Sequence, residues 1–180
     1  MTHSAPSLDT IASEQDAFER ARDAFAKKPR QMTMILAREL NVPEATIVRA
    51  MPEGMSTELN AERWEEILGS FEAMGEVHVI VSNASVTIES VGAFGGFSKA
   101  GGFFNVQGNG LDMHIRHTQL HSVFAVRKPS HLDGHDTLSV QFFDARGTAA
   151  FKVFLTFGGS DPSGERELQF SSLVEKFALS

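Results

Sequence analysis

The spacing of hydrophobic residues changes near Gly75 from a helical period to a strand period. Before Gly75, apolar residues recur at intervals of three and four, as they do on one face of an α-helix. The clearest run starts at Trp64 behind Asn60, a suitable N-cap residue, and repeats at i+3, i+4, i+7 and i+10. The pattern predicts helices at residues 13–26, as a short pair within 31–51, and at 60–74.

After Gly75 apolar and polar residues alternate, which is typical of half-buried strands. The strongest signal predicts two strands with one apolar face each, formed by Leu138, Val140 and Phe142 and by Phe151, Val153 and Leu155. Residues 144–147 supply the tight turn between them. The other predicted strands are 77–82, 85–91, 103–106, 111–117 and 120–128.

The C-terminal residues return to a helical pattern, so the order is helices, then antiparallel strands, then a helix. This order indicates an α+β fold with N-terminal helices, a large antiparallel β-sheet and a C-terminal helix. We expect a helical extension at 1–30 and a single α+β domain at 31–180. The N-terminus has no apolar signal segment, and no stretch reaches the roughly 18 apolar residues of a membrane span, so we expect a cytoplasmic protein.

Composition limits the available chemistry, because the 180 residues include no cysteine and no tyrosine but 15 phenylalanines. Disulfides, thiolate nucleophiles, Fe–S clusters and phenolate ligands are therefore excluded. The net charge of -7 argues against a general nucleic-acid binder. One stretch, residues 91–128, is locally basic, and it overlaps a segment with seven glycines between Gly92 and Gly110. Such a segment suits a small anionic ligand, although a loop with solvated lysines is the simpler interpretation.

Two other patterns have simple structural interpretations. The helix pair at 33–51 has the spacing of a helix-turn-helix unit but few basic residues, so a packed helical hairpin is favoured over DNA binding. Histidines 117 and 121 would be about 13 Å apart on one extended strand, so they share a metal ion only if the chain turns between them. The two histidines at 131 and 135 are typical of a solvated loop.

His114 has a more specific environment than the other histidines. It follows the glycine-rich segment, next to Met113, and Arg116 lies two residues later on the same side of an extended chain. With the nearby aromatic residues Phe103, Phe104 and Phe124, this strand offers an iron ligand, apolar walls and a cation, which are the groups that haem requires.

Several motifs, in order, resemble the bacterial intracellular haem carriers of the HutX/ChuX type. The leading helical segment 36–52 is similar to the start of that family, and Trp64 begins the next match. The remaining matches are GGFFNVQG (101–108), HIR (114–116), VFAVRK (123–128) and FFDARGTAAFKVFL (142–155).

The resemblance implies a homodimeric α+β protein that binds haem b in the cytoplasm and hands it to a degrading or storage partner. In this resemblance His114 matches the family's motif histidine and is the expected haem iron ligand. Phe103 stands where the family often has tyrosine, and Ser82 stands where some members have a second histidine. His78, four residues from Ser82 on the same face, is a loose substitute for that ligand.

The resulting hypothesis is a cytosolic haem carrier in which Arg116, together with Lys99 or Lys128, neutralises the haem propionates and Phe103 and Phe104 flank the ligand. The carrier is not expected to be an enzyme, and neither nucleic acid nor membrane is an expected partner. Two alternatives stay open from the sequence. In the first, the protein is an enzyme that degrades or modifies haem with an external reductant. In the second, it is a family relative that has lost haem binding and acts as an interaction module.

Overall fold

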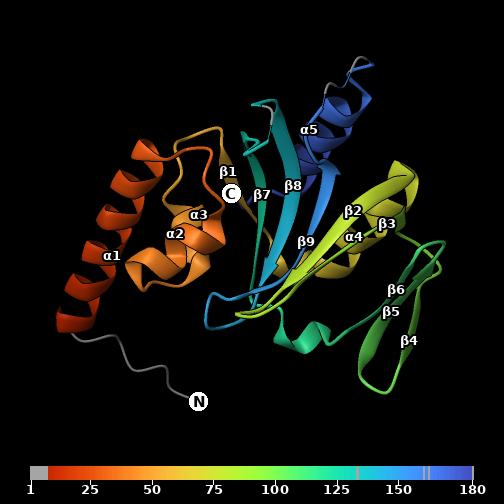
Figure 1. Cartoon of the computed structure of the whole chain (residues 1–180). Coiled ribbons are helices and arrows are strands. Elements are labelled where there is room, and N and C mark those ends of the chain that lie inside the picture. The colour runs from red at the N-terminus through yellow and green to blue at the C-terminus, as the bar shows by residue number, and fades with distance from the viewer. Residues whose placement is uncertain (1–7, 133, 160, 162, 180) are drawn as a thin grey trace.

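The computed structural model describes residues 8–132, 134–159, 161 and 163–179 (Figure 1). The helices are α1 (Leu8–Lys27), α2 (Thr33–Leu40), α3 (Glu44–Arg49), the 3-10 turn η1 (Ala61–Arg63), α4 (Trp64–Ser70), η2 (Phe71–Met74), η3 (His117–Gln119) and α5 (Glu165–Phe177). The strands are β1 (Ser56–Leu59), β2 (Glu76–Ser82), β3 (Thr87–Ala93), β4 (Ser98–Ala100), β5 (Phe103–Gly108), β6 (Leu111–Ile115), β7 (Ser122–Pro129), β8 (Asp136–Phe143) and β9 (Ala149–Thr156). The predicted α+β fold is confirmed.

The strands form two antiparallel sheets. The larger has six strands in the order β1-β7-β8-β9-β2-β3, and the smaller has three in the order β4-β5-β6. Figure 1 shows the smaller sheet beside the β2–β3 end of the larger one. The predicted hairpin at 77–91 is confirmed as β2 and β3, whereas the short strands β1 and β4 lack an alternating pattern and were not predicted.

Each face of the six-stranded sheet has its own hydrophobic core. Leu138, Val140 and Phe142 point to one face, where they join the apolar side chains of α4, α5 and the small sheet. Phe124 and Phe143 point to the other face, where they meet the helices α1, α2 and α3. The sheet is therefore the middle layer of the molecule, with the three N-terminal helices on one side of it.

The helix pair at 33–51 is a packed hairpin. Asn41 ends α2 in the left-handed conformation, with φ of 53°, and α3 begins after Pro43. Ile47 and Val48 of α3 are fully buried, so this helix has no free apolar face. Ala21 and Phe25 of α1 are buried in the same cluster, and the proposed domain division at residue 30 stays a prediction.

Two of the predicted element boundaries are wrong. The segment 60–74 is a short α-helix between two 3-10 turns, although Asn60 does cap it by accepting a hydrogen bond from the Glu62 amide. The strand predicted to reach residue 117 ends at Ile115, and His117 lies in the turn η3. The chain therefore turns just after the His114 segment, so His114, His117 and His121 do not follow one extended path.

The glycine-rich segment is close packed against the protein's own backbone. A Cβ atom on Gly108 would lie 1.8 Å from the carbonyl oxygen of Ala93, and one on Gly92 would lie 2.3 Å from that of Asn109. These glycines let the β5–β6 hairpin cross the end of β3 at backbone contact distance. Their role in the structure is thus to dock the small sheet.

In the described part of the chain, no helix combines the length and the apolar character that a membrane crossing requires.

Candidate functional site

Two cavities lie on opposite faces of the six-stranded sheet. Val79 and Val81 of β2 line the cavity that also contains His114, with a volume of about 580 Å³. Ile80 and Ser82, the alternate residues of the same strand, line a cavity of about 490 Å³ that contains Lys128. Because successive side chains of a strand point to opposite faces, the sheet separates the two cavities. We call them the His114 cavity and the Lys128 cavity.

His114 is held in place from the neighbouring strand. In the β5–β6 pair it lies directly opposite Asn105, and its Nδ1 atom is 2.8 Å from the Asn105 side-chain oxygen. The amide nitrogen of Asn105 donates a hydrogen bond to the Ser98 hydroxyl at 3.1 Å, so the amide oxygen faces the imidazole. An oxygen acceptor at Nδ1 keeps the proton there and leaves the lone pair of Nε2 available to a metal.

The His114 side chain is 60% exposed, so Nε2 can be reached from solvent. The nearest carboxylate oxygen in the described ion pairs of His114 belongs to Asp112 and lies 3.8 Å away, beyond hydrogen-bond distance. Asn105, by contrast, is buried, which keeps the positioning contact away from water. The exposed Nε2 atom of His114 is thus free to bind a metal, while the buried amide of Asn105 holds the imidazole in place.

Arg116 and Phe103 form the next pair on the same side of the small sheet. The guanidinium of Arg116 lies 4.9 Å from the centre of the Phe103 ring, a cation–π distance. The same ring meets the His114 imidazole edge to face at 6.4 Å. Phe103 therefore connects the expected iron ligand with the expected cation, and Arg116 also lines the His114 cavity.

The walls of the His114 cavity are mainly aliphatic. Val81 and Ile88, from the β2–β3 hairpin, are 42% and 62% exposed, which is unusual for large apolar residues in a sheet. Met113 and Leu120 line the cavity from the β6 side. An apolar, partly open cavity with one imidazole and one guanidinium fits a flat apolar anion.

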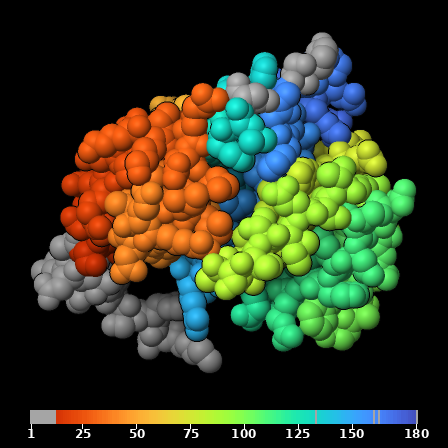
Figure 2. Space-filling view, viewed as in Figure 1, coloured from red at the N-terminus to blue at the C-terminus, as the bar shows by residue number. Residues whose placement is uncertain are grey.

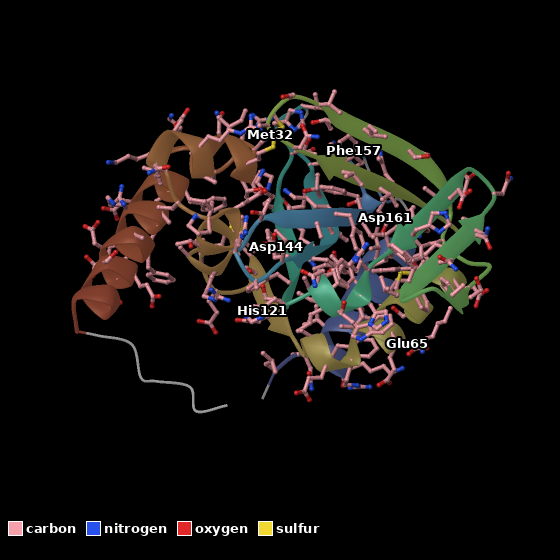
Figure 3. The ribbon with its side chains drawn as sticks, turned by 90° about the horizontal axis from the view of Figure 1, so that it is seen from below. Met32, Glu65, His121, Asp144, Phe157 and Asp161 are labelled. Atoms are coloured by element: carbon pink, nitrogen blue, oxygen red, sulfur yellow. The ribbon has the colours of Figure 1, made fainter. Side chains whose placement is uncertain are left out.

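Three of the expected site residues lie elsewhere. Phe104 is buried in the main core, where its ring meets Trp64 at 5.3 Å. Lys99 forms an ion pair with Glu65, labelled in Figure 3, at 2.6 Å and does not line the His114 cavity. Lys128 lines the other cavity, across the sheet from His114. Of the three expected cations, the structure brings only Arg116 to His114.

His78 also lies apart from His114. It belongs to the β2 face that carries Ile80, and its Nε2 atom is 3.0 Å from a Glu89 carboxylate oxygen. Its ring packs against Phe157 at 4.0 Å. Ser82, on the same face, lines the Lys128 cavity and shares a hydrogen bond with Thr87. Neither position is on the side of the sheet that faces His114.

The other histidines that the structure describes do not assemble a metal site. His117 stacks on Trp64 at 4.5 Å, His121 lines a separate groove near α1, and His131 lines the Lys128 cavity. Among the described residues, no group of three or more His, Asp or Glu side chains is placed to hold a metal ion. For these residues the structure therefore gives no support to a zinc site.

Sequence reasoning missed Asn105, which orients His114. A signal for it was available, because Asn109-Gly110 is a typical two-residue hairpin turn between Gly108 and Leu111. Counting back from that turn places residue 105 opposite residue 114. The Lys128 cavity was also missed.

The comparisons with known proteins agree with this fold. The family model described as haem utilisation ChuX/HutX matches residues 57–173. The intracellular haem transport protein HutX of Vibrio cholerae serotype O1 is 30% identical over 139 residues, which span 76% of this chain and 71% of HutX.

Solved structures show the same fold over nearly the whole chain. A crystal structure of a protein from Agrobacterium tumefaciens superposes with a TM-score of 0.79 at 26% identity, covering 97% of this chain and 99% of that one. The structure of the haem-binding protein ChuX superposes with a TM-score of 0.73 at 22% identity, covering 87% and 97%, and at this identity it shows the fold alone.

The three layers and the small sheet that carries His114 define an α+β protein of the haem-utilisation fold. The chain belongs to the ChuX/HutX haem utilisation family.

Proposed function

We propose that this protein is an intracellular haem carrier that binds haem b in the His114 cavity. The name of its HutX relative, an intracellular haem transport protein, supports this role. Nε2 of His114 is the proposed iron ligand, and Arg116 is the proposed partner of a propionate. Lys99 and Lys128 are left out of this set, because they line no part of the His114 cavity.

One observation carries the proposal, namely the hydrogen bond from His114 to Asn105. It fixes the tautomer that an iron ligand needs, and it does so at the edge of an apolar cavity that contains a guanidinium. In a histidine that served only the fold, neither the buried amide support nor the exposed Nε2 would be required. Phe103, in the position where the family often has tyrosine, packs against His114 and Arg116 without lining the cavity, and it offers no iron ligand.

A titration of the purified protein with ferric haem tests this assignment. We expect a Soret shift with the wild type and its loss, or a change of ligation in the ferric spectrum, with His114→Ala. His121→Ala is the matched control, because His121 is an exposed histidine outside the cavity. A wild-type titration without a shift, or identical spectra for wild type and His114→Ala, would contradict the proposal.

The enzyme alternative is separated by adding ascorbate and oxygen to the complex. A carrier keeps its Soret band, whereas a haem-degrading enzyme loses it and forms a linear tetrapyrrole. We propose the carrier, because haem bound at an exposed histidine on the rim of an open cavity is accessible to an acceptor protein. Such a partner, which degrades or stores haem, is part of the proposal. An interaction module without haem is the interpretation that a failed titration would favour.

A homodimer is also proposed, and β3 supports it. This strand ends the six-stranded sheet, and Val86, Ile88 and Val91 are 54%, 62% and 56% exposed on and beside it. An exposed apolar edge strand is suited to pairing with a second copy of the same strand. Sedimentation velocity tests this, since Ile88→Lys should shift a dimer to monomer, and a wild type that sediments as a monomer would contradict it.

A further inference from the structure

The β5–β6 hairpin turns at the dipeptide Asn109-Gly110, and both residues are exposed. In an Asn-Gly sequence the main-chain nitrogen of the glycine can attack the side-chain amide of the asparagine, because glycine has no Cβ atom to hinder the approach. Asn109 is the only one of the five asparagines in the sequence that precedes a glycine. The chain therefore places its most reactive Asn-X sequence in the turn just before β6, the strand that carries His114.

Neither reacting group at this turn is held by a hydrogen bond within the described residues. The amide nitrogen of Gly110 donates no hydrogen bond there, and the side chain of Asn109 has no partner. The side chains of Asn60 and Asn83, by contrast, accept hydrogen bonds from main-chain amides that follow them. Asn105 is buried and bonded to the His114 imidazole. The Asn109 side chain is thus free to approach the nitrogen that would attack it.

The peptide group between Asn109 and Gly110 also docks the hairpin on β3. Its oxygen accepts a hydrogen bond from the Ala93 amide at 3.0 Å, and the next carbonyl, that of Gly110, accepts one from the Ser90 hydroxyl at 2.8 Å. Figure 2 shows the green atoms of the small sheet against the yellow-green β2–β3 hairpin. Because a peptide group is planar, turning its nitrogen toward the Asn109 side chain also moves its oxygen away from Ala93. Undocking of the turn and attack by the Gly110 nitrogen are therefore coupled.

We propose that Asn109 is a modification site that deamidates without an enzyme, and that its product releases the β5–β6 hairpin from β3. The Gly110 nitrogen forms a bond with Cγ of Asn109, and the bond from Cγ to Nδ2 breaks. The proton of the Gly110 amide passes through solvent to the departing nitrogen, which leaves as ammonia. Water then opens the resulting succinimide at either carbonyl and gives aspartate or isoaspartate. Neither step changes an oxidation state, so no oxidant or reductant is needed.

Isoaspartate does not fit the docked turn. It carries the main chain through the former side-chain carbon, which adds one carbon–carbon bond of about 1.5 Å to the backbone, and it adds a carboxylate. A Cβ atom on Gly92 would lie 2.3 Å from the Asn109 oxygen, and one on Gly110 would lie 2.7 Å from the Val91 oxygen. Since the crossing has no room for an extra atom, the hairpin must move away from β3. The displacement of His114 that follows should weaken haem binding, a consequence that rests on the haem-carrier proposal.

The test incubates the purified haem-free protein at pH 7 and at pH 8 and follows Asn109 by peptide mass spectrometry. We expect conversion to aspartate and isoaspartate, faster at pH 8 because more of the attacking amide is deprotonated. Asn83 is the internal control and should stay intact, because its side-chain oxygen is held by two amides. Ser90→Ala should convert about 2- to 10-fold faster than wild type, the range expected for a turn that has lost one hydrogen bond. Ser85→Ala, a serine substitution in the exposed β2–β3 turn, should convert at the wild-type rate.

Two further measurements follow the hairpin after conversion. Hydrogen exchange should show that the Ala93 amide loses protection in the aged wild type, because its acceptor is the Asn109 oxygen. A titration with ferric haem should show a loss of affinity that follows the isoaspartate content. Asn109→Gln, whose longer side chain closes a ring much more slowly, should keep both properties through the same incubation.

The proposal has clear failing results. Conversion at Asn109 no faster than at Asn83, or equal rates for Ser90→Ala and wild type, would contradict a reactive site governed by docking. Conversion that leaves the protection of Ala93 unchanged would contradict release of the hairpin. Only the titration depends on haem. Lost protection at Ala93 with unchanged haem affinity would therefore confirm the modification site and count against His114 as the haem ligand.

Discussion

The side-chain oxygen of Asn105 lies 2.8 Å from Nδ1 of His114, directly across the β5–β6 pair. This contact joins a buried amide to an exposed imidazole, and the Ser98 hydroxyl fixes the orientation of the amide. Haem binding is therefore expected to depend on Asn105, which positions the imidazole, as well as on the proposed ligand His114.

The first prediction concerns this positioning contact. Asn105→Ala should raise the Kd for ferric haem about 10-fold or more, the effect typical of losing a support behind a metal-ligating histidine. Asn105→Asp should retain ligation by His114, because a carboxylate oxygen also accepts a hydrogen bond from Nδ1–H. Ferric absorption spectra recorded with the titrations show whether the ligation changes. Equal affinity and spectra for Asn105→Ala and wild type would remove Asn105 from the site.

The second prediction concerns Arg116. Replacing it with Gln should weaken haem binding by about 2- to 5-fold, the range expected for a solvent-accessible ion pair, and the difference from wild type should shrink at high salt. Lys99→Gln is the matched control, because Lys99 is paired with Glu65 outside the cavity. Titrations at low and high ionic strength measure both effects. A loss that is the same for Lys99→Gln and Arg116→Gln would point to general electrostatic attraction.

The third prediction follows from the lowered pKa of Lys128, about 8 against 10.5 for a solvated lysine. Between these values the unfolded chain holds a proton that the folded protein has lost, so this group makes the free energy of unfolding rise with pH. Below pH 8 both states are protonated and the full penalty applies. Discounted for partial solvent screening, we expect that penalty to be about 2 kcal/mol.

Lys128→Met removes that penalty, so it should be more stable than wild type by about 2 kcal/mol at pH 7, and this difference should decrease towards pH 10. Urea denaturation of both proteins at the two pH values measures it. Lys99→Met, which changes an exposed lysine, should show no such pH dependence. A difference between Lys128→Met and wild type that stays constant with pH would mean that burial does not perturb this ammonium.

The fold was predictable from the sequence where apolar and polar residues alternate along the strands. The apolar faces of β8 and β9 and the turn at 144–147 are as expected, and Gly147 indeed has a positive φ of 74°. Residues 60–74 keep the spacing of apolar contacts while the backbone tightens into 3-10 turns at both ends, which a pattern of side chains does not reveal.

The site was predictable only in part, and the sheet explains why. Strand β7 is buried on both faces, so its sequence has no alternation that would tell which face Lys128 joins. Lys128 and His114 are both near the basic segment in the sequence, yet the sheet separates them. Asn105, by contrast, follows from the register of a two-residue turn, so local geometry was a better guide than charge.

The last prediction concerns the glycines that dock the small sheet. A Cβ atom on Gly108 would lie 1.8 Å from the Ala93 carbonyl oxygen, so Gly108→Ala forces the β5–β6 hairpin away from β3. We expect a loss of about 2 kcal/mol in the free energy of unfolding, typical of overpacking, together with weaker haem binding because β6 carries His114. Gly69→Ala is the control, since Gly69 is helical with open space around it and alanine there should stabilise by up to about 1 kcal/mol. Urea denaturation and haem titration of both variants measure the two effects. Unchanged stability of Gly108→Ala would show that the hairpin can shift without cost and that the close crossing does not position the site.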